Sequence, residues 1–217
     1  MQSDKIRNIA IIAHVDHGKT TLVDGMLKQT KSFAAHQAEM TQTTILDSND
    51  LERERGVTIL AKNTVVFWHD YKINILDTPG HADFSGEVER VLNMADGCIL
   101  LVDSAEGVLS QTRFVLSLAL NLGLQPIVLI NKVDRKDQRA AEVIEEVNDL
   151  FLEVAVNDDQ LRFPVLYGIG RSGIVGKEIA VTSEHEHSLK ITDSTDLTVL
   201  FQTVVDTIPA PKVEAEG

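Results

Sequence analysis

Apolar runs of strand length alternate with segments of helical period along most of the chain. This alternation is typical of a mostly parallel sheet whose strands are joined by crossover helices. Six runs are predicted to be strands: 6–13, 65–68, 72–76, 97–102, 125–130 and 163–167. Several are apolar at nearly every position, as strands buried on both faces of a parallel sheet are. The pattern therefore predicts an α/β fold.

Two later segments each place their apolar residues on a single helical face, which predicts helices that pack on the sheet. The first face comprises Ala140, Val143, Ile144, Val147, Leu150, Phe151 and Val154, and the second comprises Leu197, Leu200, Phe201, Val204, Val205 and Ile208. The connection 68–71 is too short for a crossover, so the strands beside it are predicted to be antiparallel. We expect a mostly parallel six-stranded sheet with helices on both faces and one antiparallel edge strand.

Two stretches lack this periodicity. Residues 30–56 are rich in Thr, Gln, Asp and Glu, and are longer than a connector in a compact domain needs, which indicates a functional loop. Residues 168–195 hold several glycines among polar residues and are predicted to be a surface loop. Residues 1–208 are expected to form one domain, and the Pro-containing residues 209–217 to begin a linker to a following domain that is absent here.

Composition narrows the class of protein. The chain has 217 residues, 43% of them hydrophobic, and a formal net charge of −13, which argues against a surface that coats nucleic acid. A single cysteine, Cys98, excludes a disulfide framework and fits a reducing compartment. No window approaches the roughly 20 apolar residues of a membrane span, and we see no signal peptide. We expect a cytoplasmic protein that does not contact membranes.

The first predicted strand is followed by the sequence AHVDHGKT, at residues 13–20, and then by a helical segment. This order is the context of a phosphate-binding loop, from which the sequence departs by having Ala13 in place of the first glycine. Backbone N–H groups of the loop and the helix start are expected to converge on phosphate groups. These N–H groups belong to Asp16, His17, Gly18, Lys19, Thr20 and Thr21. The Lys19 side chain would add a positive charge there, and the Thr20 hydroxyl would ligate Mg²⁺.

A second acidic position for the magnesium site follows the third predicted strand. Asp77 ends this strand, beside the first loop in a sheet of this kind, and is expected to reach the metal, through water in our interpretation. Gly80, three residues on, would let its backbone N–H approach a γ-phosphate without a side chain in the way. We therefore expect a nucleotide-sensing switch after Asp77.

The sequence NKVD, at residues 131–134, follows the fifth predicted strand. At this position the Asp134 carboxylate can accept hydrogen bonds from N1–H and the 2-amino group of guanine, donors that adenine lacks. Asn131 would bond to N7 of the base and to the neighbouring loop, and the Lys132 stem would cover one face of the ring. The expected nucleotide is GTP or GDP rather than ATP.

These motifs, with RGVTI at residues 55–59 and DTPGH at residues 77–81, resemble those of translational GTPases, and residues 46–64 are most similar to the BipA, or TypA, family. The resemblance implies a P-loop NTPase G domain that hydrolyses GTP with Lys19, Thr58 and His81 in catalytic roles. Thr58 would close on Mg²⁺ and the γ-phosphate, and His81 would orient the attacking water. Asp16 would help to hold a monovalent cation.

The family further implies a Mg²⁺-dependent GTPase coupled to the ribosome in translation or in assembly of the large subunit. Its partners would be rRNA, ribosomal proteins and A-site tRNA, reached mainly through domains absent here, and the chain is expected to be a monomer. Two alternatives stay open. One is a guanine-nucleotide sensor for GTP, GDP or guanosine tetraphosphate whose hydrolysis is dispensable, and the other is a GTPase of the elongation factor G or LepA type.

The sequence departs from this family after the sixth predicted strand. Ile169 and Gly170 stand where the family usually has a Ser-Ala pair that helps to read guanine O6. The N–H of Gly170 could still serve, but the glycines make the loop harder to order, so we expect weaker nucleotide affinity than is usual in the family. The sequence His185-Glu186-His187 has metal-binding side chains, but without further ligands nearby we interpret it as part of a solvated loop.

Overall fold

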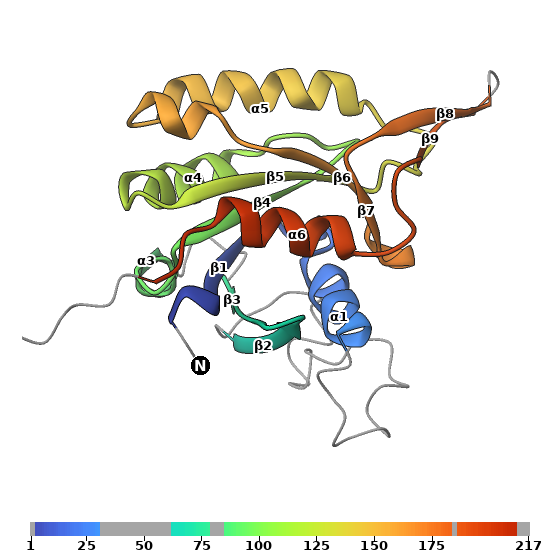
Figure 1. The fold of residues 1–217 in the computed structure, drawn as a ribbon. Coiled ribbons are helices and arrows are strands. Elements are labelled where there is room, and N and C mark those ends of the chain that lie inside the picture. The colour runs from blue at the N-terminus through green and yellow to red at the C-terminus, as the bar shows by residue number, and fades with distance from the viewer. Residues whose placement is uncertain (1–2, 31–61, 79–84, 184–185, 212–217) are drawn as a thin grey trace, which may run out of the picture.

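The structure is a computed structural model that describes residues 3–30, 62–78, 85–183 and 186–211. Its main sheet has seven strands in the order β2-β3-β1-β4-β5-β6-β7 (Figure 1). The strands are β1 (Ile6–Ala13), β2 (Lys62–Trp68), β3 (Tyr71–Asp77), β4 (Gly97–Asp103), β5 (Gln125–Asn131), β6 (Val165–Ile169) and β7 (Ile174–Gly176). The helices are α1 (Lys19–Gln29), α3 (Ser85–Leu92), α4 (Ser110–Asn121), α5 (Ala140–Val154) and α6 (Thr198–Thr207).

The predicted α/β fold class is confirmed. The five central strands, from β3 to β6, are mutually parallel, and β2 pairs with β3 in the antiparallel direction through the predicted short connection. The predicted number of six strands is wrong, because β7 pairs antiparallel with β6 and adds a second antiparallel edge to the described part of the sheet. A strand of three residues that ends in a glycine is too short to stand out as an apolar run.

The strand β7 forms because the chain reverses direction directly after β6. Gly173 adopts a left-handed conformation with φ of 64°, and its N–H bonds to the Gly170 carbonyl at 3.0 Å, which closes the turn. Val175, at the centre of β7, is fully buried, and its backbone N–H donates to the Asp196 carbonyl at 2.9 Å. The outer edge of β7 is therefore bonded to the segment that leads into α6.

The prediction of a surface loop over residues 168–195 is wrong, because this stretch contains β7 and a further pair of strands. The same stretch contains β8 (Ile179–Ser183) and β9 (Glu186–Ile191), which pair with each other as a separate antiparallel sheet that projects beyond the end of the main sheet (Figure 1). Ile179, Leu189 and Ile191 of the hairpin pack against the core, whereas Val181 in β8 is 60% exposed. The Leu189 N–H of β9 ties the hairpin to the Val133 carbonyl at 2.9 Å.

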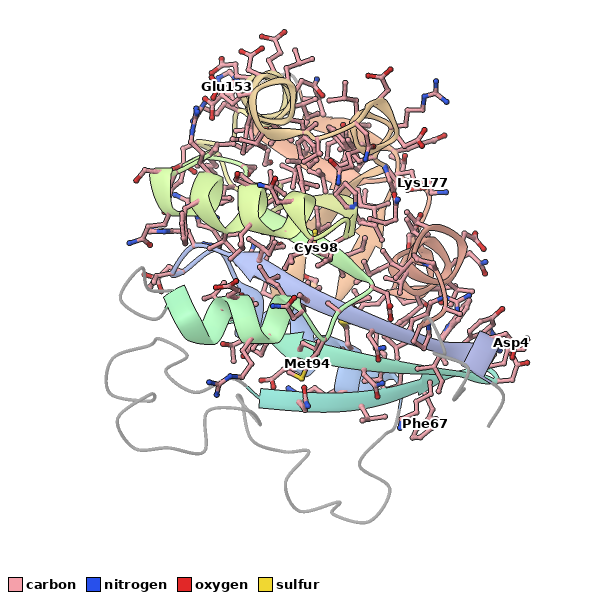
Figure 2. All side chains as sticks on the ribbon, turned by 90° about the vertical axis from the view of Figure 1, so that its left-hand side faces the viewer. Asp4, Phe67, Met94, Cys98, Glu153 and Lys177 are labelled. Carbon is pink, nitrogen blue, oxygen red and sulfur yellow. The ribbon has the colours of Figure 1, made fainter. Side chains whose placement is uncertain are left out.

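Helices cover both faces of the sheet, as predicted. The buried apolar residues of α1 and α6 pack on one face, and those of α3, α4 and α5 pack on the other. Every residue of β4 is buried, including Cys98, whose thiol pKa is raised by burial to about 12 (Figure 2). Cys98 is therefore a residue of the core. In the residues that the structure describes, no helix is long and apolar enough to cross a membrane.

The parallel register brings the carboxyl ends of the central strands to one edge of the sheet. Ile11 of β1 lies opposite Asp77, and Asp103 of β4 lies opposite Asn131 of β5. Ligands of open α/β sheets bind at this edge, outside the ends of the strands. The fold thus places two separate sequence motifs, those that contain Asp77 and Asn131, next to the loop between β1 and α1.

Candidate nucleotide-binding site

The loop between β1 and α1 has a backbone that depends on glycine at one position. Gly18 adopts a φ of +97°, and a Cβ atom built there would lie 2.5 Å from Nδ2 of Asn131. Gly18 is also the N-cap of α1, and no side chain caps the backbone N–H groups that begin this helix. An uncapped helix N-terminus directs its N–H groups and the positive end of its dipole toward the space outside. The arrangement suits phosphate oxygens, as the sequence predicts.

Lys19, at the start of α1, is buried against the end of β3. Its ammonium nitrogen lies 2.8 Å from Oδ1 of Asp77 and also donates to the Thr78 carbonyl. Thr78 is in turn fixed by a hydrogen bond from its hydroxyl to the Ile11 carbonyl at 2.6 Å. The structure therefore brings together the lysine and the aspartate that the sequence assigns to the phosphates and the metal. Thr20, which is also predicted to bind the metal, directly follows Lys19 in α1 and is half-buried.

His17 has a side chain that points into the protein rather than toward the site. The ring is fully buried, its Nε2 lies 3.3 Å from Glu106 Oε2, and its Nδ1 lies 3.3 Å from the Asp103 backbone nitrogen. Burial lowers the pKa of His17 from its ordinary value, which favours the neutral ring. Nδ1 also lies 3.3 Å from the Leu101 carbonyl oxygen, so both ring nitrogens have polar partners inside the protein. The side chain thus anchors the loop, and only the backbone of His17 is left for a ligand.

Asn131 connects the loop to the opposite wall of the site. Its side-chain Nδ2 donates to the His17 carbonyl at 2.8 Å, and its Oδ1 accepts from the Gly170 N–H at 3.0 Å. The Asn131 side chain is itself buried. The predicted bond from Asn131 to the neighbouring loop is therefore present. The backbone N–H of Gly170, which the sequence predicts to contact guanine O6, donates to Asn131 in this structure.

Lys132 extends across the mouth of the loop. Its ammonium group donates to the Asp16 carbonyl at 2.6 Å and lies 2.8 Å from Oδ2 of Asp103. Burial alone would raise the pKa of Asp103, but hydrogen bonds from Lys132 and from the Ala105 N–H hold that pKa below its usual range. Asp103 therefore stays ionised and fixes the Lys132 stem over the space where a base would lie.

These groups enclose a cavity of about 180 Å³. It is lined by Gly18, Thr21, Asn131, Lys132, Asp134, Arg135, Gly170 and Arg171. The four residues predicted to contact the base, Asn131, Lys132, Asp134 and Gly170, therefore lie in one pocket next to the phosphate loop. The carboxylate of Asp134 is only 18% exposed and is ion-paired with Arg171.

Some predicted site residues fall outside the part of the chain that the structure describes. These are Thr58, Gly80 and His81, so their assigned roles stay predictions. Four other residues of the site were not predicted from the sequence: Asp103, Glu106, Arg135 and Arg171. Asp103 could have been found, because it ends a buried parallel strand and so lies at the same edge as Asp77 and Asn131.

A phosphate loop at the carboxyl edge of a parallel sheet, beside a lysine–aspartate pair and a polar base pocket, defines a P-loop nucleotide-binding domain. Within this class, the chain belongs to the family described as the elongation factor Tu GTP binding domain, whose sequence model matches residues 4–210. GTP binding is the shared property that this description states.

Known relatives refine the comparison. The chain is 53% identical to the large ribosomal subunit assembly factor BipA of Escherichia coli strain K12, over 99% of this chain and 33% of the relative. It is 51% identical to the protein of the same name from Bacillus subtilis strain 168, over 97% of this chain and 32% of the relative. The resemblance to BipA is therefore confirmed, and the chain spans about a third of the length of these relatives.

Solved structures agree with this assignment. A bacterial selenocysteine-specific elongation factor, EF-Sec, matches with a TM-score of 0.61 and 25% identity, over 76% of this chain and 26% of that one. A protein from Thermus thermophilus matches with a TM-score of 0.60 and 27% identity, over 67% of this chain and 22% of that one. In both cases the described fold is similar to a minor part of a longer chain.

Proposed function

We propose that this chain is the guanine-nucleotide-binding part of a Mg²⁺-dependent GTPase, which hydrolyses GTP to GDP and phosphate. The observation that carries the proposal is the pair of hydrogen bonds made by Asn131, to the His17 carbonyl and from the Gly170 N–H. These bonds hold a pocket for a base and a loop for phosphates in one fixed relation. A nucleotide is the kind of ligand that needs both.

The base pocket favours guanine. Asp134 is a largely buried carboxylate, and a guanine ring offers it two donors, N1–H and the 2-amino group. Adenine offers neither donor, so its binding would leave a buried acceptor without a partner from the ligand. Asn131 would bond to N7, and Lys132 would cover one face of the ring. Gly170 would contribute its N–H to O6 by sharing it with Asn131.

The phosphate side of the site fits a magnesium ion. The backbone N–H groups of residues 16–21 and the Lys19 ammonium group would bind the phosphates. Thr20 and Asp77 would supply hydroxyl and carboxylate oxygens, the ligand type that Mg²⁺ prefers, and Asp77 Oδ1 lies 2.8 Å from the Lys19 ammonium nitrogen. Together with Thr58 they would hold the ion, which when bound neutralises charge on the outer phosphates. Asp16 would hold a monovalent cation nearby.

For hydrolysis we assign the orientation of the attacking water to His81 and closure of the site to Thr58. Phosphoryl transfer depends mainly on positioning and on charge stabilisation, which Lys19 would supply. Because no arginine is assigned to the transferring phosphate, turnover by the chain alone should be slow. A ribosome would accelerate it by aligning His81.

The biological setting is proposed from the relatives. The name of the Escherichia coli and Bacillus subtilis proteins describes large ribosomal subunit assembly, and this chain covers about a third of each. We propose that it acts as a monomer in the cytoplasm within a longer protein. That protein would contact rRNA, ribosomal proteins and A-site tRNA mainly through its other domains. These relatives favour the BipA type over the elongation factor G and LepA types.

Calorimetric titration with GDP and ADP in the presence of Mg²⁺ tests nucleotide recognition. Wild type should bind GDP in strong preference to ADP. Lys19→Ala should reduce GDP affinity by tenfold or more, about 1.4 kcal/mol, because it removes the positive charge beside Asp77. Lys28→Ala is the matched control, because Lys28 is exposed at the other end of the same helix. Equal affinity for the two nucleotides, or none for either, would refute the proposal.

Phosphate release with and without ribosomes tests the enzymatic part. Single-turnover hydrolysis of GTP should be measurable in wild type and lost in His81→Ala. Tight binding without phosphate release would instead support a nucleotide sensor.

A further inference from the structure

Arg171 lies at the rim of the base pocket and forms an ion pair with Asp134. The guanidinium Nη2 lies in ion-pair contact with Oδ2 of the carboxylate. The Arg171 side chain is 78% exposed, whereas that of Asp134 is 18% exposed. Asp134 is the acceptor that the proposed function assigns to guanine. This acceptor therefore already has a cationic partner from the chain itself.

We propose that Arg171 is a specificity-determining residue that competes with the 2-amino group of guanine for Asp134. The inference rests on the proposed function. A guanine ring places N1–H on one carboxylate oxygen and its 2-amino group on the other, so Arg171 must leave Oδ2. Hypoxanthine has the N1–H but no 2-amino group, and it leaves Oδ2 to Arg171. Arg171 therefore narrows the difference in affinity between the two bases.

The structure allows this exchange without rearrangement of the backbone. Arg171 lies in a short 3-10 turn, Gly170–Ser172, which is closed by the hydrogen bond from the Gly173 N–H to the Gly170 carbonyl. The side chain is mostly in solvent, so its guanidinium group can turn away while the turn stays in place. An ion pair with so exposed a partner is weak, and we expect the competition to change affinity by about two- to fivefold.

A second arginine offers a matched control. Arg135 also lines the pocket, but its guanidinium group pairs with Asp137 at 2.6 Å and with Asp103 at 3.3 Å. Removing Arg135 takes the same charge from the same pocket without releasing Asp134. Any general effect of lost positive charge on a diphosphate ligand should then appear in Arg135→Ala and should be equal for both bases.

The test is calorimetric titration of the Mg²⁺-supplied chain with GDP and with inosine diphosphate. We expect the ratio of the two dissociation constants, inosine diphosphate over GDP, to rise about two- to fivefold in Arg171→Ala relative to wild type. The ratio should be unchanged in Arg135→Ala. Arg171→Lys, which keeps the charge but loses the planar fork of donors, should give an intermediate ratio. Thermal unfolding checks that each variant is folded.

The failures of the two proposals are distinguishable. A wild-type chain that binds neither diphosphate would refute the proposed function itself. A wild-type chain that prefers GDP to ADP, combined with an unchanged or lowered ratio in Arg171→Ala, would refute the role of Arg171 alone. A ratio that rises equally in Arg135→Ala would also overturn it, because loss of charge would then be sufficient.

Discussion

Substitution of Asn131 by alanine should separate the phosphate loop from the base pocket. The substitution removes two buried hydrogen bonds, at 2.8 Å to the His17 carbonyl and at 3.0 Å from the Gly170 N–H. Each bond contributes about 1 kcal/mol net, and a buried group left without a partner adds a penalty of about 1–3 kcal/mol. We expect the free energy of unfolding to fall by about 2–4 kcal/mol, and GDP affinity to fall at least tenfold.

Urea denaturation without nucleotide measures the first effect, and calorimetric titration with GDP measures the second. Asn121→Ala is the control, because Asn121 bonds to the Ser117 carbonyl at 2.7 Å on the exposed end of α4. That variant should stay within about 0.5 kcal/mol of wild type. If Asn131→Ala changes the free energy of unfolding no more than this control does, the two bonds do not hold the site together, and the central argument for a nucleotide is wrong.

Two further predictions concern the same loop. Burial lowers the pKa of His17, so the unfolded chain takes up this proton at higher pH than the folded chain does. The contribution of His17 to the free energy of unfolding should be complete above about pH 6.5 and be lost as the pH falls below that value. Urea denaturation at about pH 7.5 and about pH 5.5 should show a smaller loss of stability between the two pH values in His17→Gln than in wild type. Gly18→Ala should destabilise the chain more than Gly123→Ala in urea denaturation. Both glycines have positive φ, of +97° and +79°, but only the added Cβ at residue 18 would collide, with Asn131 Nδ2 at 2.5 Å. Equal losses in the two variants would show that backbone strain alone determines the effect.

The sequence predicted the central strands and the motifs at their ends because burial on both faces leaves continuous apolar runs. The strand β4, for example, is buried at every residue, and both predicted helical faces lie in the core. The edge elements were missed for the complementary reason. The strand β7 has only three residues, which are too few to show the alternation that identifies a strand. The strands β8 and β9 have short alternating apolar positions, but these lie among polar and charged residues.

The site was predictable where its chemistry lies within a motif, and not where it depends on contacts between distant segments. Lys19, Asp77, Asn131 and Asp134 carry recognisable spacing. Nothing in the sequence indicates that the Arg171 side chain contacts Asp134, since the two residues are 37 positions apart along the chain. The buried orientation of His17 is likewise set by contacts with the backbone of Asp103 at the end of β4 and with the side chain of Glu106 in the turn that follows.

The way in which β7 ends the sheet bears on how the molecule behaves at high concentration. A border strand with unused backbone donors can serve as a template for a strand from another molecule, which leads to aggregation. The strand β7 is short, and the N–H at its centre, that of Val175, is already bonded to the Asp196 carbonyl. This side of the domain therefore offers a neighbouring molecule little to pair with, which protects the chain against growth of the sheet from one copy to the next.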